Sequence, residues 1–116
     1  MLDHVRAGVA YIAGRIISGS DSSYVYDYSQ GKHISISGSV DRDSVSVYDY
    51  TSHAHIGGSS SGIYHYGERS YINLTISGHD FTGYDYGTQT HFSGNVSGNS
   101  ISLYDYQLGR HFSYTT

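Results

Sequence analysis

The sequence predicts an all-β domain built from repeats, preceded by one amphipathic α-helix. Aliphatic residues near the start of the chain follow a helical period. From residue 22 onward, apolar and polar residues alternate in short runs, and a Tyr-Asp-Tyr triplet recurs about every 20 residues. A chain of 116 residues fits a single domain. We therefore expect one domain, 1–116, with a helix at 1–19 and the repeats at 22–116.

The composition narrows the classes of partner and cofactor. The net charge is -4, and the six Lys and Arg residues are scattered along the chain, so we expect no nucleic-acid partner. The chain has no Cys, which excludes disulfides and Cys-ligated zinc. We expect no cofactor.

The first 20 residues are fairly apolar but do not follow the pattern of a secretion signal. Such a signal has a basic start and an unbroken apolar stretch, whereas here Asp3 precedes Arg6, and Gly14 with Arg15 interrupts the run. No stretch approaches the roughly 20 apolar residues of a membrane span. The expected location is cytoplasmic, with no membrane partner.

The helix expected at 1–19 carries one aliphatic stripe. Gly19, between two serines, supplies a stop signal. Gly8, Gly14 and three alanines leave a thin surface that another element can approach closely. Two roles are open: the helix covers the apolar face or end of the domain, or it forms a helix-to-helix dimer seam. The polar residues His4, Arg6 and Arg15 can lie off the stripe. The stripe itself consists of Leu2, Val5, Val9, Ile12 and Ile16.

The triplets give the domain its repeat. They start at residues 26, 48, 84 and 104, and "YHY" at 64 is a degenerate fifth copy, so the steps are 22, 16, 20 and 20 residues. Even steps keep each side chain on the same face of a pleated sheet. Turn signals recur about every ten residues, which predicts about ten short strands.

Two architectures satisfy this spacing. The first is an array of antiparallel β-hairpins, a meander, in which Gly98 and Asn99 form a two-residue turn that pairs Val96 with Ile101. The alternative is a β-solenoid capped by the helix, because periods of about 20 residues are also typical of stacked coils. We favour the meander.

Alternation separates the side chains of each repeat onto two faces. Aliphatic residues and the triplet Asp share one face, which we expect to be buried, while the Tyr residues share the other. Two interpretations of the Tyr face are open. Cross-strand aromatic contacts can simply stabilise the sheet, or the Tyr residues, with nearby Ser, Gly and Asn, can bind a glycan or a protein. The candidate ligand-binding residues are Tyr26, Tyr28, Tyr48, Tyr50, Tyr64, Tyr66, Tyr84, Tyr86, Tyr104 and Tyr106.

A His follows each triplet Asp at a distance of six residues. A three-residue loop with Gly31 left-handed would place Asp27 opposite His33, whereas a two-residue turn would place Tyr28 there. A carboxylate that orients an imidazole occurs in catalytic and metal sites. Four similar copies argue against one specialised active site, so we expect no enzyme. The four pairs are Asp27 with His33, Asp49 with His55, Asp85 with His91, and Asp105 with His111.

Metal binding is a weaker hypothesis than plain cross-strand pairing. His53 and His55 are the best candidates, because alternate residues of a strand project to one face, but two His ligands without a third are weak evidence for zinc or copper. We therefore assign no metal ligand.

The pattern "YDYxxGxHFS", clearest at residues 104–113, and the opening "MLDHVRAGVAYIAGRIISGS" resemble short, uncharacterised bacterial single-domain proteins. The resemblance implies a bacterial origin and no known activity, so no functional residue follows from it. The second triplet copy lacks the turn Gly, and "YHY" lacks the Asp.

The sequence thus predicts a non-enzymatic structural or binding module that presents a Tyr-rich sheet face. The first alternative is an assembly protein whose subunits are joined through the helix or through sheet edges. A homodimer fits this alternative, because a helix of about 25 Å covers only about half the width of ten strands. The second alternative is a His-based metal-binding protein.

Overall fold

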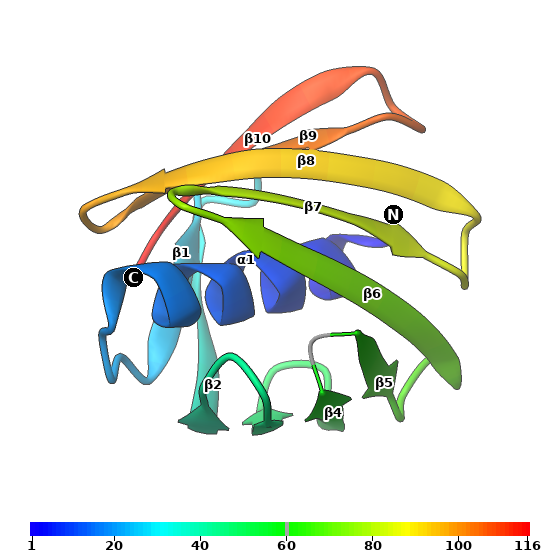
Figure 1. The fold of residues 1–116 in the computed structure, drawn as a ribbon, viewed down its shortest axis with the longest axis horizontal. Helices are drawn as coiled ribbons and strands as arrows, with labels where there is room; N and C mark the ends of the chain where they lie inside the picture. The colour runs from blue at the N-terminus through cyan, green and yellow to red at the C-terminus, as the bar shows by residue number, and fades with distance from the viewer. Residues whose placement is uncertain (60) are drawn as a thin grey trace.

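The protein is a closed barrel of ten antiparallel strands that surrounds one α-helix, as seen in the computed structural model (Figure 1). The structure describes residues 1–59 and 61–116. The elements are α1 (Asp3–Ser18), β1 (Tyr24–Asp27), β2 (Lys32–Val40), β3 (Val45–Asp49), β4 (Ala54–Ser59), β5 (Gly62–His65), β6 (Ser70–Ser77), β7 (Asp80–Asp85), β8 (Thr90–Ser97), β9 (Ser100–Asp105) and β10 (Arg110–Thr115). The expected meander with an N-terminal helix is confirmed.

Each strand pairs with the next one along the chain, so the solenoid alternative is not needed. The two-residue turn at Gly98 and Asn99 is confirmed, because Val96 pairs with Ile101 and Gly98 has a φ of 59°. The alternation did not predict that the sheet closes. Strand β1 pairs with β10 through two residue pairs, Tyr26 with Thr115 and Asp27 with Tyr114, whereas β9 and β10 share six pairs. The β1–β10 seam is thus a short one.

The barrel wall has an apolar inner face and a polar outer face, as the alternation predicts. In β3, Val45, Val47 and Asp49 are buried, while Tyr48 lies between them on the outer side. The same pattern of burial recurs in β9. The aliphatic residues therefore form the core, and the triplet Tyr residues lie on the outside.

The helix lies inside the barrel, which corrects the expectation that it covers one face or end. Every residue from Val5 to Gly14 is buried, including those outside the aliphatic stripe. Ala7, Ala10 and Ala13 are fully buried and face the wall with small side chains. The alanines and the two glycines keep the helix thin over much of the surface that the stripe leaves free, while Arg6 and Tyr11 are large buried side chains outside the stripe.

The two helical glycines mark the closest approaches between helix and wall. A Cβ atom at Gly14 would lie 2.6 Å from Ile101 Cδ1 in β9, and one at Gly8 would lie 3.0 Å from Ile56 Cδ1 in β4. Both distances are too short for ordinary van der Waals contact. Glycine at these positions trades helix propensity, about 1 kcal/mol against Ala, for room inside the barrel.

In two residue pairs between β7 and β8, a phenylalanine of one strand lies opposite a glycine of the other. Phe81 pairs with Gly94, and Phe92 pairs with Gly83. A Cβ at Gly83 would lie 2.4 Å from Phe92 Cζ, and one at Gly94 would lie 2.4 Å from Phe81 Cζ. Each ring thus occupies the space that its glycine partner leaves empty, and the two rings lie 6.3 Å apart.

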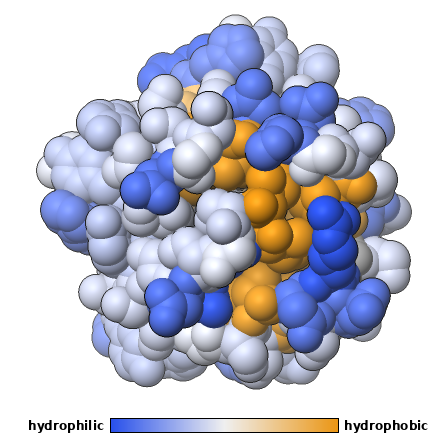
Figure 2. Space-filling model, turned by 60° about the vertical axis from the view of Figure 1, so that its left-hand side comes forward, coloured by the Kyte–Doolittle hydropathy of each residue, from blue (hydrophilic) through white to orange (hydrophobic). Residues whose placement is uncertain are grey.

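An apolar patch is exposed at the end of the barrel where α1 finishes. Figure 2 shows it on the side that lies to the left in Figure 1. Ile16 and Ile17 belong to the last turn of α1, and Val40 and Ile76 lie near the ends of β2 and β6 at the same end of the barrel. All four are partly buried and pack against the core.

Within the described residues, no helix is long and apolar enough to cross a membrane.

Substituting Gly14 by Leu should destabilise the barrel, because the new side chain would enter the space of Ile101. We expect the free energy of unfolding to fall by about 1–3 kcal/mol, a cost typical of overpacking. In a protein that carries Ile101→Ala, Gly14→Leu should lower the free energy of unfolding by no more than half of what it costs in the wild type. Urea denaturation of the two single variants and the double variant measures the coupling. Strict additivity of the two effects would show that Gly14 and Ile101 are not in contact.

Candidate functional site

All five triplet copies end in the same turn. Four positions after the buried Asp or His of each copy stands a residue with left-handed backbone. The residue after that begins the next strand and pairs with the same Asp or His. The loops therefore have four residues. Three of the left-handed residues are not glycine, so the turn survives in copies that lack the Gly. The five are Gly31, His53, Arg69, Gln89 and Gly109, with φ of 55–66°.

The triplet Asp is a turn cap. In each copy, one carboxylate oxygen accepts a hydrogen bond from the backbone N–H two residues on, a contact that fixes tight turns. The copies agree closely in geometry. The donors are the N–H groups of Ser29 at 2.9 Å from Asp27, Thr51 at 2.9 Å from Asp49, Gly87 at 3.0 Å from Asp85, and Gln107 at 2.9 Å from Asp105.

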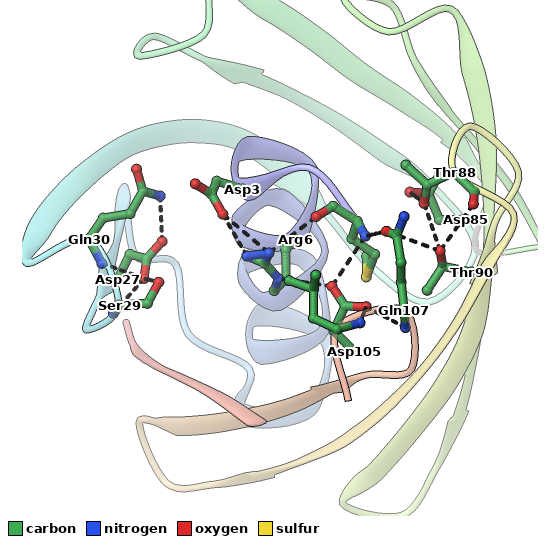
Figure 3. A network of polar contacts seen from close by, with 12 residues as sticks. Asp3, Arg6, Asp27, Ser29, Gln30, Asp85, Thr88, Thr90, Asp105 and Gln107 are labelled. Atoms are coloured by element: carbon green, nitrogen blue, oxygen red, sulfur yellow. Dashed lines mark hydrogen bonds and ion pairs between the residues drawn. The ribbon is translucent and has the colours of Figure 1, made fainter. Parts of the chain in front are cut away.

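These carboxylates are buried at the barrel end where α1 begins. Figure 3 shows Asp27, Asp85 and Asp105 on the wall around the first turns of the helix. Each is at most 2% exposed. The N-terminus of a helix carries a partial positive charge, so acidic groups around it are stabilising. The caps therefore serve the turns and the helix together.

Arg6 of α1 is the basic residue among these buried carboxylates. It was expected off the buried stripe, but its side chain is 1% exposed. Its guanidinium contacts Asp3 Oδ1 at 2.9 Å and Asp105 Oδ2 at 3.4 Å, and it lies 3.6 Å above the centre of the Phe112 ring. A buried charge needs such partners. Local periodicity could not predict this burial, because the partner Asp105 is 99 residues away in the sequence.

Asp105 also accepts a hydrogen bond from the amino group of Met1, at 3.2 Å. Burial by itself would raise the pKa of Asp105. The hydrogen bond and charge of the Met1 amino group, with the N–H groups of Gln107 and Leu108, outweigh burial and lower this pKa below its usual value.

His65 takes the place of Asp in the fifth copy. Its Nδ1 accepts the N–H of Glu68 at 3.2 Å, so it caps its turn as the Asp residues do. The side chain is 1% exposed, and its ring lies 5.4 Å from that of His4. Burial, followed by the nearby His4, lowers the pKa of His65. The neutral form is therefore favoured in the folded protein.

The triplet Tyr residues form aromatic groups on the outside of the barrel. The first Tyr of each triplet is half-buried, and the second is 54–58% exposed. The two rings meet edge to face at 4.8–4.9 Å, the geometry that aromatic pairs prefer. In three copies a His from the next strand joins them at 4.7 Å. These contacts are Tyr26 with His33, Tyr84 with His91, and Tyr104 with His111.

Both alternatives for the partner of His33, Asp27 and Tyr28, are wrong. Because the loop has four residues, His33 pairs with Tyr26 across the hairpin, and Asp27 pairs with Lys32. The same register places His55 opposite Tyr48, His91 opposite Tyr84 and His111 opposite Tyr104. Asp and His end on opposite faces of the wall, so no carboxylate orients these imidazoles.

The proposed metal candidates do not share a strand. His53 is the left-handed turn residue, whereas His55 lies in β4 with its ring 5.2 Å from that of Tyr66. Across residues 1–59 and 61–116, no group of three or more His, Cys, Asp or Glu residues is placed to hold a metal ion.

Two adjoining grooves lie on the outer wall over β6 to β9. The first, of about 470 Å³, has Tyr84, His91 and Tyr106 among its lining residues. The second, of about 390 Å³, is lined in part by Tyr104 and His111. Thr82 and Ser93 line both grooves, so the two grooves adjoin. Of the ten candidate Tyr residues, these grooves bring together Tyr84, Tyr104 and Tyr106.

Besides Phe81, Phe92 and two glycines, the remaining groove residues are short polar side chains that the sequence pattern did not single out. Their signal was weak, because Ser and Thr are common throughout the chain. Only the register of β6 to β9 brings them together. They are Asn73, Thr75, Thr82 and Ser93 in the first groove, and Asp80, Asn95 and Ser102 in the second.

Comparison with known protein families, with characterised proteins and with solved structures finds no match to this chain.

Replacing His65 by Asn should remove a pH-dependent loss of stability. The unfolded chain binds a proton at His65 near pH 6.5, but the folded protein resists it, so wild-type stability falls as the pH drops below about 6.5. Asn keeps an acceptor for Glu68 N–H but does not titrate. The difference in unfolding free energy, wild type minus variant, should fall by up to about 1.4 kcal/mol per pH unit between pH 6.5 and the lowered pKa.

Urea denaturation at pH 7.5 and 5.5 measures this difference. His91→Asn is the matched control, because His91 lies exposed on the outer wall. An equal pH trend in both variants would show that burial of His65 has no part in the effect.

Proposed function

We propose that the chain is a non-enzymatic binding module whose outer wall recognises carbohydrate. The observation that carries this proposal is the pair of adjoining grooves over β6 to β9, with Tyr and His rings beside short polar side chains. Aromatic rings provide flat apolar contact area, and Ser, Thr and Asn provide adaptable hydrogen bonds. A sugar ring presents an apolar face and hydroxyl groups at its edge, so it fits both kinds of contact.

The arrangement of the rings supports an extended ligand. Tyr84 and Tyr104 pack edge to face against Tyr86 and Tyr106, and the His partners hold them from the other side. Each ring is thereby held in place before a ligand arrives, which reduces the entropy lost on binding. Two such groups side by side suit a chain of sugar units better than a single sugar.

The origin and location of the protein are part of the same proposal. A bacterial origin and a cytoplasmic site remain predictions from the sequence. A protein ligand remains the alternative occupant of the same wall.

The double variant Tyr84→Ser/Tyr106→Ser should lose glycan binding. We expect an affinity at least tenfold lower than that of the wild type, because both rings line the first groove. A glycan array identifies the ligand, and calorimetry with that ligand measures the loss. The control variant Tyr26→Ser/Tyr50→Ser likewise removes one half-buried and one exposed triplet ring, and both lie outside the two grooves. No binding by the wild type, or an equal loss in both variants, would contradict the proposal.

Assembly is the second candidate function, and the apolar patch favours it. The closed barrel leaves no unpaired strand edge among the described residues, and α1 is buried from Val5 to Gly14 and reaches the surface at its two ends. The apolar part of the helix that a second copy can reach is Ile16 and Ile17, next to Val40 and Ile76. Patches of this kind commonly mark protein contacts.

If two copies associate through this patch, Ile17→Ser/Ile76→Ser should convert a dimer to a monomer. Light scattering over a hundredfold range of concentration measures the mass of both proteins. Leu108→Ser, at an exposed position in a turn at the other end of the barrel, is the control. A wild-type monomer at every concentration would exclude this assembly.

A further inference from the structure

A small cavity opens beside the helix at the barrel end where α1 begins. Its volume is about 240 Å³, enough for a molecule of a few heavy atoms. It lies on the opposite end of α1 from the apolar patch and away from the outer grooves. The polar residues that line it include Asp3, His4, Gln30, Lys32, Asp49 and Ser52.

The four triplet carboxylates allow a comparison within the molecule. Each uses one oxygen to cap its turn, which leaves the second oxygen in need of a donor. For Asp27 the donor is Gln30 Nε2 at 2.6 Å, and for Asp85 it is Thr88 Oγ1 at 2.9 Å. For Asp105 it is the Met1 amino group at 3.2 Å, with Arg6 Nε at 3.4 Å.

Asp49 is the exception. Its Oδ1 caps the N–H groups of Thr51 and Ser52, but its Oδ2 has no hydrogen-bond partner in the described part of the chain. The residue is 0% exposed and lines the cavity. Leaving a buried carboxylate oxygen without a donor is costly, on the order of 1–3 kcal/mol or more. A ligand that donates a hydrogen bond to this oxygen would remove that cost, and the removal would contribute to its binding free energy.

The local sequence explains why Asp49 differs. Gln30 and Thr88 stand three residues after Asp27 and Asp85, and their side chains reach back to the second oxygen. Ser52 occupies the same position after Asp49, but its Oγ is buried and also lacks a partner among the described residues. The cavity is thus lined by an unpaired acceptor and an unpaired hydroxyl that stand three residues apart in one turn.

The charges around the cavity favour a cation with N–H donors. Hydrogen bonds from a charged donor to a carboxylate are about twice as strong as neutral ones. Two carboxylates, those of Asp3 and Asp49, line the cavity, against one permanent cation, Lys32. A divalent metal would need more ligands than the described residues bring together.

We propose that this cavity binds the primary ammonium group of a small amine, with Asp49 Oδ2 as the acceptor. The Ser52 hydroxyl accepts a second N–H of the same group. Lys32 stands exposed at the rim and opposes the cation, so it limits affinity. The proposal is independent of the outer grooves, because no residue lines both sites.

The test uses methylammonium chloride as the probe and tetramethylammonium chloride and methanol as comparisons. Tetramethylammonium has the same charge but no N–H donor, and methanol has a donor but no charge. The amide resonances of Thr51 and Ser52, whose N–H groups contact Asp49, report binding in NMR titrations at constant ionic strength. We expect a saturable shift with methylammonium and at least tenfold weaker effects with the other two.

Three variants locate the effect. Asp49→Asn should abolish the methylammonium response, whereas Asp85→Asn, the same change where Thr88 supplies the donor, should keep it. Ser52→Gln should place an amide where Gln30 stands in the first copy, so that the protein itself satisfies Asp49. This variant should lose the response and gain a few degrees in Tm.

Ser52→Gln keeps the proposal testable even if Asp49→Asn fails to fold. Equal shifts with methylammonium and tetramethylammonium, or an undiminished response in Ser52→Gln, would overturn it. The absence of any saturable shift would also overturn it, and would mean that only water satisfies Asp49.

Discussion

The width of the barrel interior is the constraint on which the rest of the structure depends. Ten strands enclose a space that their own inward aliphatic side chains do not fill, and α1 fills the remainder. The helix must therefore be thin, which accounts for Ala7, Ala10 and Ala13 and for glycine at the approaches of Ile56 and Ile101. A helix of this composition is a poor helix by propensity, and its stability comes from packing on all sides.

Enclosing a helix creates an electrostatic problem at its buried start, and the repeat solves it. The same Asp that caps each turn faces inward toward the positive end of the helix. Arg6 then balances part of the acidic charge from within. The Tyr and His side chains of the outer face neither cap the turns nor contact the helix, so they are available for recognition.

Alternation and turn signals were sufficient to predict ten strands, their faces and the turn at Gly98, because these depend on local periodicity. Closure was not predictable, since it depends on pairing between residues such as Tyr26 and Thr115, far apart in sequence. Neither Asp27 nor Tyr28 is the partner of His33, because loop length decides register and the loop has four residues rather than two or three. For the candidate site, the Tyr positions were foreseen on the outer face, but the polar groove residues and the burial of Arg6 arise only from the closed fold.

The barrel can close through the short seam between β1 and β10 only after β10 has been synthesised. The helix is translated before any strand of the wall, yet its enclosure requires β10, the last of the ten. Until that strand leaves the ribosome, the growing sheet is an open curl with an apolar lining exposed to water. Exposed apolar surface and a final contact between the most distant parts of the sequence are both features typical of slow folding and of a need for chaperones.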